Sequence, residues 1–157
     1  LIEKLRKKIP GLVLRTSVIV GFPGETKKDF AELLEFLRQT RFERLGAFTY
    51  SKEEDTAAAR LASQVPEAVK KERFDAVMAL QQKISLEKNK EFLGKRVKVL
   101  IDAKEEGGGV SFEGRTQGDA PEVDGVVYVS GKGLKAGEFC DVKITDTLEY
   151  DLAGVKI

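Results

Sequence analysis

Two glycines interrupt the chain where an apolar run gives way to a charged, helix-like segment. The run Val18–Val20 ends at Gly21, and Gly24 follows after Phe-Pro. A strand that leaves through such a turn and enters a helix presents bare backbone amides at the helix N-terminus, where α/β proteins bind ligands. The spacing fits neither the dinucleotide fingerprint nor the phosphate-binding loop. Two interpretations stay open: a turn that contacts a ligand, or a tight strand-to-helix connection.

Three side chains near this turn are candidates for the same ligand. Arg15 lies in an otherwise apolar segment, where a buried charge is costly unless it is paired. It is either a clamp for a ligand carboxylate or a structural partner of Glu25 or Glu43. Phe48 and Tyr50 alternate with small residues on the next apolar segment, so each is either a core residue or a ligand contact.

The composition offers few groups for metal or nucleophilic chemistry. The chain of 157 residues contains no His, and Cys140 is its single Cys. Histidine is the commonest general base and metal ligand. Cys140 lies in an alternating apolar stretch and is interpreted as a small strand residue, and the acidic run 53–55 as a solvated loop. We predict no catalytic and no metal-binding residue in this chain.

The first part of the chain has the pattern of parallel βα units. Helical patterns alternate with apolar, β-branched segments in the order 1–9, 12–20, 26–39 and 45–50. Thr26 and Asp29 predict a capping box at the second helix. Two parallel strands cannot cover both faces of a sheet. We therefore favour a fragment of a larger domain, and self-association through the open sheet edge is the alternative.

A long helical pattern follows, and then the hydrophobic period changes to two. The helix is expected from Pro66 to about Phe92. Short strands are expected at 97–101, 110–116, 126–129, 139–145 and 148–152, with a turn at 105–109. Such a series predicts a small antiparallel barrel. The fold class is thus α/β plus all-β, with expected boundaries at 1–65, 66–93 and 94–157.

Two segments of the first part resemble a known family. LRTSVIVGFPGET, residues 14–26, resembles the later half of the radical S-adenosylmethionine (SAM) barrel in methylthiotransferases. RLGAFTYSKEEDTAAA, residues 44–59, resembles the next strand of that barrel. Asp55 stands where the family usually has Gly, which affects the expected conformation of that loop.

The rest of the chain extends the resemblance. Residues 72–102 resemble the connection from that barrel to a TRAM domain, an OB-like β-barrel. GDAPEVDGVVYVSG, residues 118–131, and EYDLAG, residues 149–154, resemble the RimO-type branch, which modifies a ribosomal protein, more than the tRNA-modifying MiaB-type branch. The chain is therefore identified as similar to a C-terminal fragment of a RimO-type enzyme.

The resemblance implies a radical SAM enzyme that methylthiolates the β-carbon of an aspartate in a small-subunit ribosomal protein. SAM and two 4Fe-4S clusters are the implied cofactors, but this chain lacks the cluster-binding cysteines. It would supply part of the SAM pocket and a substrate-docking TRAM domain, and alone it would be inactive. No apolar run reaches the roughly 20 residues of a membrane helix, and the family implies a cytoplasmic protein. The residues implied to contact SAM are Arg15, Gly21, Gly24, Phe48 and Tyr50.

Charge favours a protein client over nucleic acid. Acidic residues outnumber basic ones in 92–157, although the whole chain has a formal net charge of +1. RNA-binding surfaces are normally basic, and acidic surfaces attract basic proteins. Asp119, Glu122 and Asp124 are therefore the expected docking residues for a basic ribosomal protein, and an ordinary solvated surface is the structural alternative. The remaining functional alternatives are a MiaB-type tRNA methylthiotransferase and a non-catalytic RNA- or protein-binding adaptor.

Overall fold

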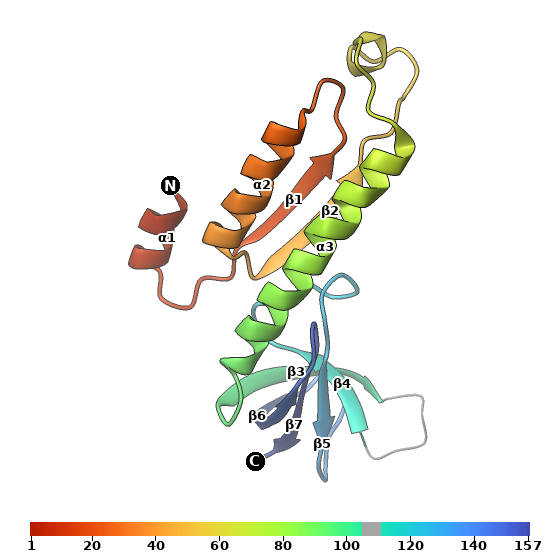
Figure 1. Cartoon of the computed structure of the whole chain (residues 1–157). Coiled ribbons are helices and arrows are strands. Elements are labelled where there is room, and N and C mark those ends of the chain that lie inside the picture. Colours follow the sequence, from red (N-terminus) through yellow and green to blue (C-terminus); the bar gives the residue numbers. More distant parts are fainter. Residues whose placement is uncertain (105–110) are drawn as a thin grey trace. The chain divides into compact units, whose positions relative to one another are not determined.

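The computed structural model describes residues 1–104 and 111–157, which divide into the units Leu1–Ile84 and Ser85–Ile157 (Figure 1). The first contains α1 (Ile2–Lys8), β1 (Arg15–Val20), α2 (Lys27–Thr40), β2 (Arg44–Thr49), the short 3-10 helix η1 (Ala58–Arg60) and most of α3 (Glu67–Lys90). The second contains the end of α3, β3 (Arg96–Lys104), β4 (Ser111–Arg115), β5 (Val127–Ser130), β6 (Phe139–Thr147) and β7 (Leu152–Lys156).

The first unit is built on a parallel pair of strands with one covered face. β1 and β2 run in register, with Val18 beside Ala47 and Ile19 beside Phe48. Val20 and Ala47 are buried against residues of α2 and α3, and Figure 1 shows both helices on the same side of the sheet. On the other face Ile19 and Phe48 are each 58% exposed. The expected buried strand is therefore buried on one face only.

The start of α2 confirms the predicted capping box. Thr26 Oγ1 accepts a hydrogen bond from the backbone N–H of Asp29 at 3.2 Å, and Asp29 Oδ2 accepts one from the N–H of Thr26 at 2.8 Å. These reciprocal bonds satisfy amides that a helix otherwise leaves without partners. The hydrogen bond from the Thr26 backbone, followed by that from its hydroxyl, lowers the pKa of the Asp29 carboxyl.

The buried side of α3 differs from its predicted apolar face. Val77 and Ile84 are buried as expected, but the same side also buries Lys70, Arg73 and Gln81. Apolar periodicity does not identify these polar positions, because long charged side chains are usually found on the solvated side of a helix. Each of the three also has a hydrogen-bond partner in a distant part of the sequence, namely Tyr50 for Lys70, Glu25 for Arg73 and Phe42 for Gln81.

The second unit is a closed five-stranded barrel in the order β3-β4-β5-β7-β6. The prediction of a small five-stranded barrel is confirmed. The expectation of a wholly antiparallel barrel is wrong, because β5 and β7 pair in parallel, with Val127 opposite Leu152. The expected turn at 105–109 and the first residue of the strand predicted at 110–116 lie outside the described residues.

The last strand also lies further along the chain than predicted. The segment 148–151 is a turn, in which Leu148 N donates to Asp151 O at 2.9 Å, and β7 begins at Leu152. Gly154 is buried within β7, where a Cβ atom would lie 2.5 Å from Val142 Cγ1. Glycine usually weakens a strand, but here it allows a neighbouring side chain to approach closely.

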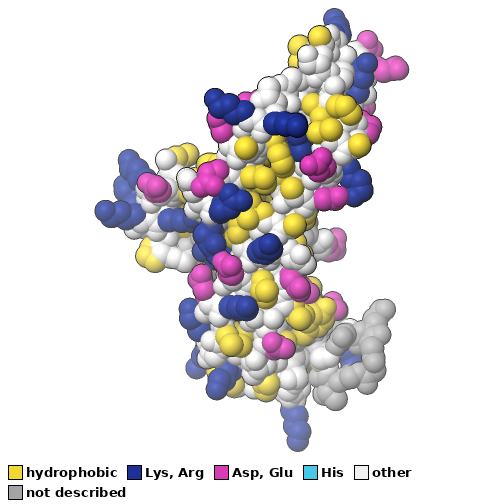
Figure 2. Space-filling model, viewed as in Figure 1, with side chains coloured by type: hydrophobic (Ala, Val, Ile, Leu, Met, Phe, Trp, Pro, Cys, Tyr) yellow, Lys and Arg dark blue, Asp and Glu magenta, His cyan; other side chains and the backbone are white. Residues whose placement is uncertain are grey.

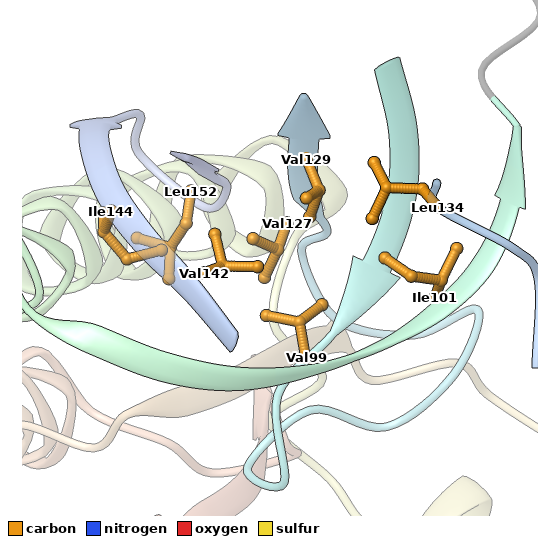
Figure 3. Packing of buried hydrophobic residues seen from close by; sticks show 8 residues of the cluster. All are labelled: Val99, Ile101, Val127, Val129, Leu134, Val142, Ile144 and Leu152. Carbon is orange, nitrogen blue, oxygen red and sulfur yellow. The ribbon is translucent and has the colours of Figure 1, made fainter. Parts of the chain in front are cut away.

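The barrel interior is aliphatic. Side chains from four strands and from the β5–β6 connection point toward one another (Figure 3). Val99, Val129, Val142 and Ile144 have no measurable exposure. In the part of the chain that the structure describes, no helix combines the length and apolar character required to cross a membrane.

Candidate functional site

The glycine turn lies at the carboxyl end of β1, and its two glycines have different surroundings. Gly21 is buried with φ +76°, and a Cβ atom there would lie 2.4 Å from Lys70 Cγ. Gly24 is exposed with φ +87° in open space, and its N–H donates to Ser63 O at 2.9 Å. The positive φ favours glycine at both positions. Gly21 must in addition leave room for the side chain of a helix residue.

A buried ion pair fastens the turn to α3. Glu25 Oε2 accepts a hydrogen bond from the N–H of Gly21 at 3.0 Å, and Glu25 Oε1 pairs with Arg73 Nη1. The Glu25 and Arg73 side chains are only 13% and 7% exposed. Glu25, one of the two partners expected for Arg15, forms an ion pair with Arg73. Sequence reasoning missed Arg73, which lies far along the chain from the turn.

A second buried cation lies on the same face of α3. The side chain of Lys70 is 4% exposed, and Nζ donates to Tyr50 O at 2.9 Å and to Glu67 Oε1 at 2.6 Å. The same ammonium lies 5.2 Å from the centre of the Tyr50 ring, a distance typical of a cation–π contact. Lys70 therefore connects the ends of both strands: its stem packs on Gly21 and its head holds Tyr50.

Tyr50 has a hydroxyl group that the described residues do not satisfy. Its ring packs edge-on against Phe22 at a centroid distance of 5.3 Å. Its Oη atom is buried without a hydrogen-bond partner among the described residues. A buried polar group without a partner is costly, so this hydroxyl indicates a place for a polar ligand atom. Phe22 is 45% exposed, which leaves an aromatic surface beside it.

The structure brings only some of the predicted site residues together. Gly21 and Tyr50 lie at the carboxyl ends of β1 and β2, and Tyr50 N donates to Val20 O at 2.8 Å. Phe48 lies on the exposed face of the sheet, and Arg15 starts β1 at its opposite end. Arg15 is exposed, so the expectation of a buried charge there is wrong. The strand alternates between a packed and an open face, and Arg15 belongs to the open one.

Glu43, the other carboxylate considered for Arg15, has structural partners elsewhere. It lies 3.1 Å from Arg6 Nη2 and accepts a hydrogen bond from the N–H of Leu14 at 2.9 Å. A groove of about 580 Å³ also opens beside the end of β2, and no predicted site residue lines it. Its lining residues are Thr49, Glu67, Ala68, Lys71, Phe74 and Asp75.

The predicted acidic docking residues differ in how far they are engaged. Asp119 Oδ2 accepts hydrogen bonds from Thr116 N at 3.0 Å and Thr116 Oγ1 at 2.6 Å. Asp124 Oδ2 accepts one from Ala120 N at 2.7 Å. Glu122 is exposed with φ +62°. Two of the three carboxylates thus stabilise their own loop and are partly buried, whereas Glu122 is exposed.

Comparison with known proteins finds a family match for the last part of the chain and relatives of nearly the whole chain. Residues 93–157 match the TRAM domain family. The whole chain is similar to proteins named ribosomal protein uS12 methylthiotransferase RimO. The identity is 52% for that of Pelotomaculum thermopropionicum, over 98% of this chain and 35% of the relative. For Anaeromyxobacter sp. strain K it is 50%, over 98% and 33%, and for Clostridioides difficile 51%, over 98% and 34%.

Over nearly its whole length, the chain is related to the RimO methylthiotransferases. The resemblance stated from the motifs is thereby confirmed. The chain spans about a third of the length of the RimO relatives it matches.

The TRAM domain is not uniformly acidic on its surface. Arg96 and Lys143 are register partners on β3 and β6, and Lys98 lies on the same outer face as Arg96. All three are exposed, and Asp141 pairs with Arg96 at 2.7 Å. In Figure 2, Lys and Arg side chains gather along the left side of the barrel. A surplus of acidic residues in the sequence therefore coexists with a locally basic face.

The TRAM domain offers no constellation for metal chemistry in its described part. Cys140 is half-buried opposite Val99, and burial raises the pKa of its thiol. A thiol with a raised pKa is a poor nucleophile and a poor metal ligand at neutral pH. Among the described residues of the whole chain, no group of three His, Cys, Asp or Glu side chains could hold a metal ion.

Proposed function

We propose that this chain is part of an enzyme that methylthiolates the β-carbon of an aspartate in ribosomal protein uS12 by radical SAM chemistry. The observation that carries the proposal is the identity of about half over 98% of the chain with proteins named for uS12 methylthiotransferase activity. Residues 1–65 would be the last part of a radical SAM barrel, 66–93 a connecting helix and 94–157 the TRAM domain. The parallel pair β1–β2 with α2 between its strands in sequence supports this division.

The carboxyl ends of β1 and β2 have the properties of a site for one end of SAM. Gly21 and Gly24 expose backbone, Phe22 provides an aromatic surface, and the unsatisfied Tyr50 hydroxyl can bond a polar ligand atom. When bound, SAM supplies the radical chemistry and the methyl group. The residues of this chain bind and orient it. Phe48 would contribute from the open sheet face.

Arg15 extends the proposed pocket along that same open face. It lies five residues before Val20 in β1, which corresponds to a distance of about 16 Å at the usual rise of a strand. It would therefore contact a different part of the ligand from the glycine turn, and its guanidinium suits a carboxylate. The iron–sulfur clusters do not fit the residues present, because Cys140 is the single Cys of the chain. We therefore propose that the chain alone is inactive.

The TRAM domain would position the substrate protein. Asp119, Glu122 and Asp124 are proposed to attract basic uS12. Because Asp119 and Asp124 bond their own loop, Glu122 is the best single residue for testing this docking surface. Charge attraction would bring the client aspartate to the barrel, where correct positioning is the main contribution of the protein.

An RNA client is the second candidate, and a specific surface favours it. Arg96, Lys98 and Lys143 are exposed on one outer face of the barrel, and Phe139 on β6 is 68% exposed. Cationic strands with an exposed aromatic ring suit single-stranded nucleic acid. The methylthiotransferase would then act on RNA, as in the MiaB-type branch.

The two candidates are separated by assaying both substrates. A cluster-reconstituted protein that contains this chain and its upstream barrel is incubated with SAM and either uS12 or bulk tRNA. We expect mass spectrometry to find a methylthio group on one aspartate of uS12 and none on tRNA. Modified tRNA with unmodified uS12 would establish the RNA candidate, and two unmodified substrates would refute the proposal.

Substrate docking is tested with one charge reversal and a matched control. Glu122→Lys is expected to raise the KM for uS12 and to leave SAM binding unchanged. The control is Glu138→Lys, because Glu138 is also an exposed carboxylate of the TRAM domain. An equal effect of both variants would show that the whole acidic surface matters and not this loop.

A further inference from the structure

Two cationic side chains are buried on α3 beneath the glycine turn, although packing by itself does not require charge there. Lys70 and Arg73 are 3% and 6% exposed. Burying a charge is costly, and a hydrophobic residue of similar volume often stabilises a fold equally well. Their contacts with the turn and with Tyr50 indicate what these cations do.

Arg73 acts on the turn through Glu25. Arg73 Nη1 pairs with Glu25 Oε1 and donates to the backbone O of Glu25 at 3.2 Å. Glu25 Oε2 in turn accepts the N–H of Gly21 at 3.0 Å. The guanidinium carbon also lies 5.4 Å from the centre of the Phe30 ring. One side chain of α3 thereby holds both the first and the last residue of the segment Gly21–Glu25.

Lys70 acts on the other side of the same turn. Its stem occupies the space that a side chain at position 21 would need. Its ammonium donates to the backbone O of Tyr50 and lies over the Tyr50 ring. The two cations therefore fix the relative positions of the Gly21 backbone and Tyr50, which belong to the ends of different strands.

We propose that Arg73 and Lys70 are positioning residues, which hold the Gly21–Glu25 turn and Tyr50 in the arrangement that binds SAM before SAM arrives. This inference rests on the proposed function, in which the turn contacts SAM. Preorganisation increases affinity because the ordering entropy is lost during folding and not during binding. Neither residue needs to touch the ligand.

The first test measures the turn without ligand. Amide hydrogen exchange is followed in the 157-residue chain and in its Arg73→Met variant. We expect exchange at Gly21 to accelerate by about tenfold or more, because its acceptor loses a charged partner. Arg38→Met is the matched control, because Arg38 pairs with Glu35 at 2.7 Å on the surface of the same unit. Arg73→Lys, which keeps the charge, should restore part of the protection.

The second test measures SAM binding in the cluster-reconstituted protein that contains this chain. Equilibrium dialysis with radiolabelled SAM should give a Kd about tenfold higher for Arg73→Met than for the parent, an intermediate value for Arg73→Lys and an unchanged value for Arg38→Met. The KM for uS12 should not change. Lys70→Met is expected to raise the Kd for SAM as Arg73→Met does. In amide exchange, it should accelerate Tyr50 instead of Gly21.

The outcomes separate this inference from the proposed function. A parent protein that binds no SAM would refute the proposed function itself. A parent that binds SAM, with an Arg73→Met variant that binds equally well, would overturn only the positioning role. Uniformly faster exchange across residues 1–84 in Arg73→Met would also overturn it, because the residue would then serve general stability.

Discussion

The two units of the chain differ in whether each strand is hydrogen-bonded to a neighbour along both of its edges. Every strand of the TRAM barrel has a partner on each side, and the ring closes between β3 and β6. The first unit has two strands, and their outer face leaves Ile19 and Phe48 more than half exposed. A closed barrel removes its edges and can be stable on its own. The two-stranded sheet leaves an apolar face open to contact with another molecule or another segment.

Their buried residues differ in the same way. The barrel core consists of Val, Ile and Leu side chains, whereas the first unit buries Lys70 and Arg73 beside Val77 on one helix. Aliphatic packing specifies a shape without specific chemistry. Buried charges with mutual partners fix the positions of particular backbone groups. The comparison teaches that apolar packing shapes the barrel, whereas buried charged contacts fix the strand ends of the first unit.

The largest expected effect comes from a glycine in the closed unit. A Cβ atom added at Gly125 would lie 1.9 Å from Tyr150 O. A Cβ atom added at Gly24 would have no other atom within 4 Å. We expect Gly125→Ala to destabilise the barrel by more than about 4 kcal/mol and Gly24→Ala to cost about 1 kcal/mol through its positive φ. Urea unfolding followed by circular dichroism measures both. Similar losses of unfolding free energy in the two variants would contradict the contrast between a tightly packed and an open unit.

Truncating one isoleucine in each unit should give the next largest contrast. Ile144 is fully buried in the barrel, and Ile19 is 58% exposed on the open sheet face. Ile144→Ala should cost about 3 kcal/mol and Ile19→Ala less than about 0.5 kcal/mol. Thermal unfolding of both variants tests this. A large cost at Ile19 would mean that the open face is covered in solution, for example by a second copy.

A buried amide provides a smaller effect. Asn89 at the end of α3 is 2% exposed, and its Nδ2 donates to Leu148 O at 3.0 Å. We expect Asn89→Ala to cost about 2 kcal/mol, because the carbonyl oxygens of the 148–151 turn lose their donor. Gln82→Ala, an exposed amide on the same helix, is the control. If Asn89→Ala accelerated amide exchange more in the first unit than in the 148–151 turn, Asn89 would not be the residue that stabilises this turn.

The smallest effect concerns the cap of α2. Thr26→Ala removes the hydroxyl that bonds Asp29 and should cost about 1 kcal/mol. The pKa of Asp29 is lowered from its ordinary value of 3.8, so its contribution is present above that pH and is lost as the pH falls through the folded pKa. Carboxyl NMR titration should show the pKa of Asp29 rising in Thr26→Ala. An unchanged pKa would contradict the capping box.

Local features were the ones that the sequence predicted well. The capping box depends on Thr26 and Asp29, which are three residues apart, and α3 begins directly after Pro66 as proline at the first turn suggests. The period of two predicted the barrel strands, because alternate residues must face the interior. Each of these signals is contained within one turn or one strand.

The features that could not be predicted depend on distant partners. Glu25 and Arg73 are 48 residues apart, and no spacing in the sequence indicates that they meet. The strand predicted at 148–152 stops short of Gly154, and nothing in the sequence indicates that Val142 packs closely against this glycine. The loop that contains Asp119 gave an incomplete prediction for a local reason. A cluster of acidic residues in a sequence does not reveal that two of its carboxylates accept hydrogen bonds from the backbone of their own loop.

The insertion of β7 between β5 and β6 has a consequence for the order of events during synthesis. Strands β3 to β6 can leave the ribosome and pair as neighbours while β5 and β6 still lack the strand that joins them. The ring is completed only when residues 152–156 have emerged. Until then the nascent barrel exposes two unpaired strand edges. Such edges can pair with other chains and aggregate, which a chaperone would prevent.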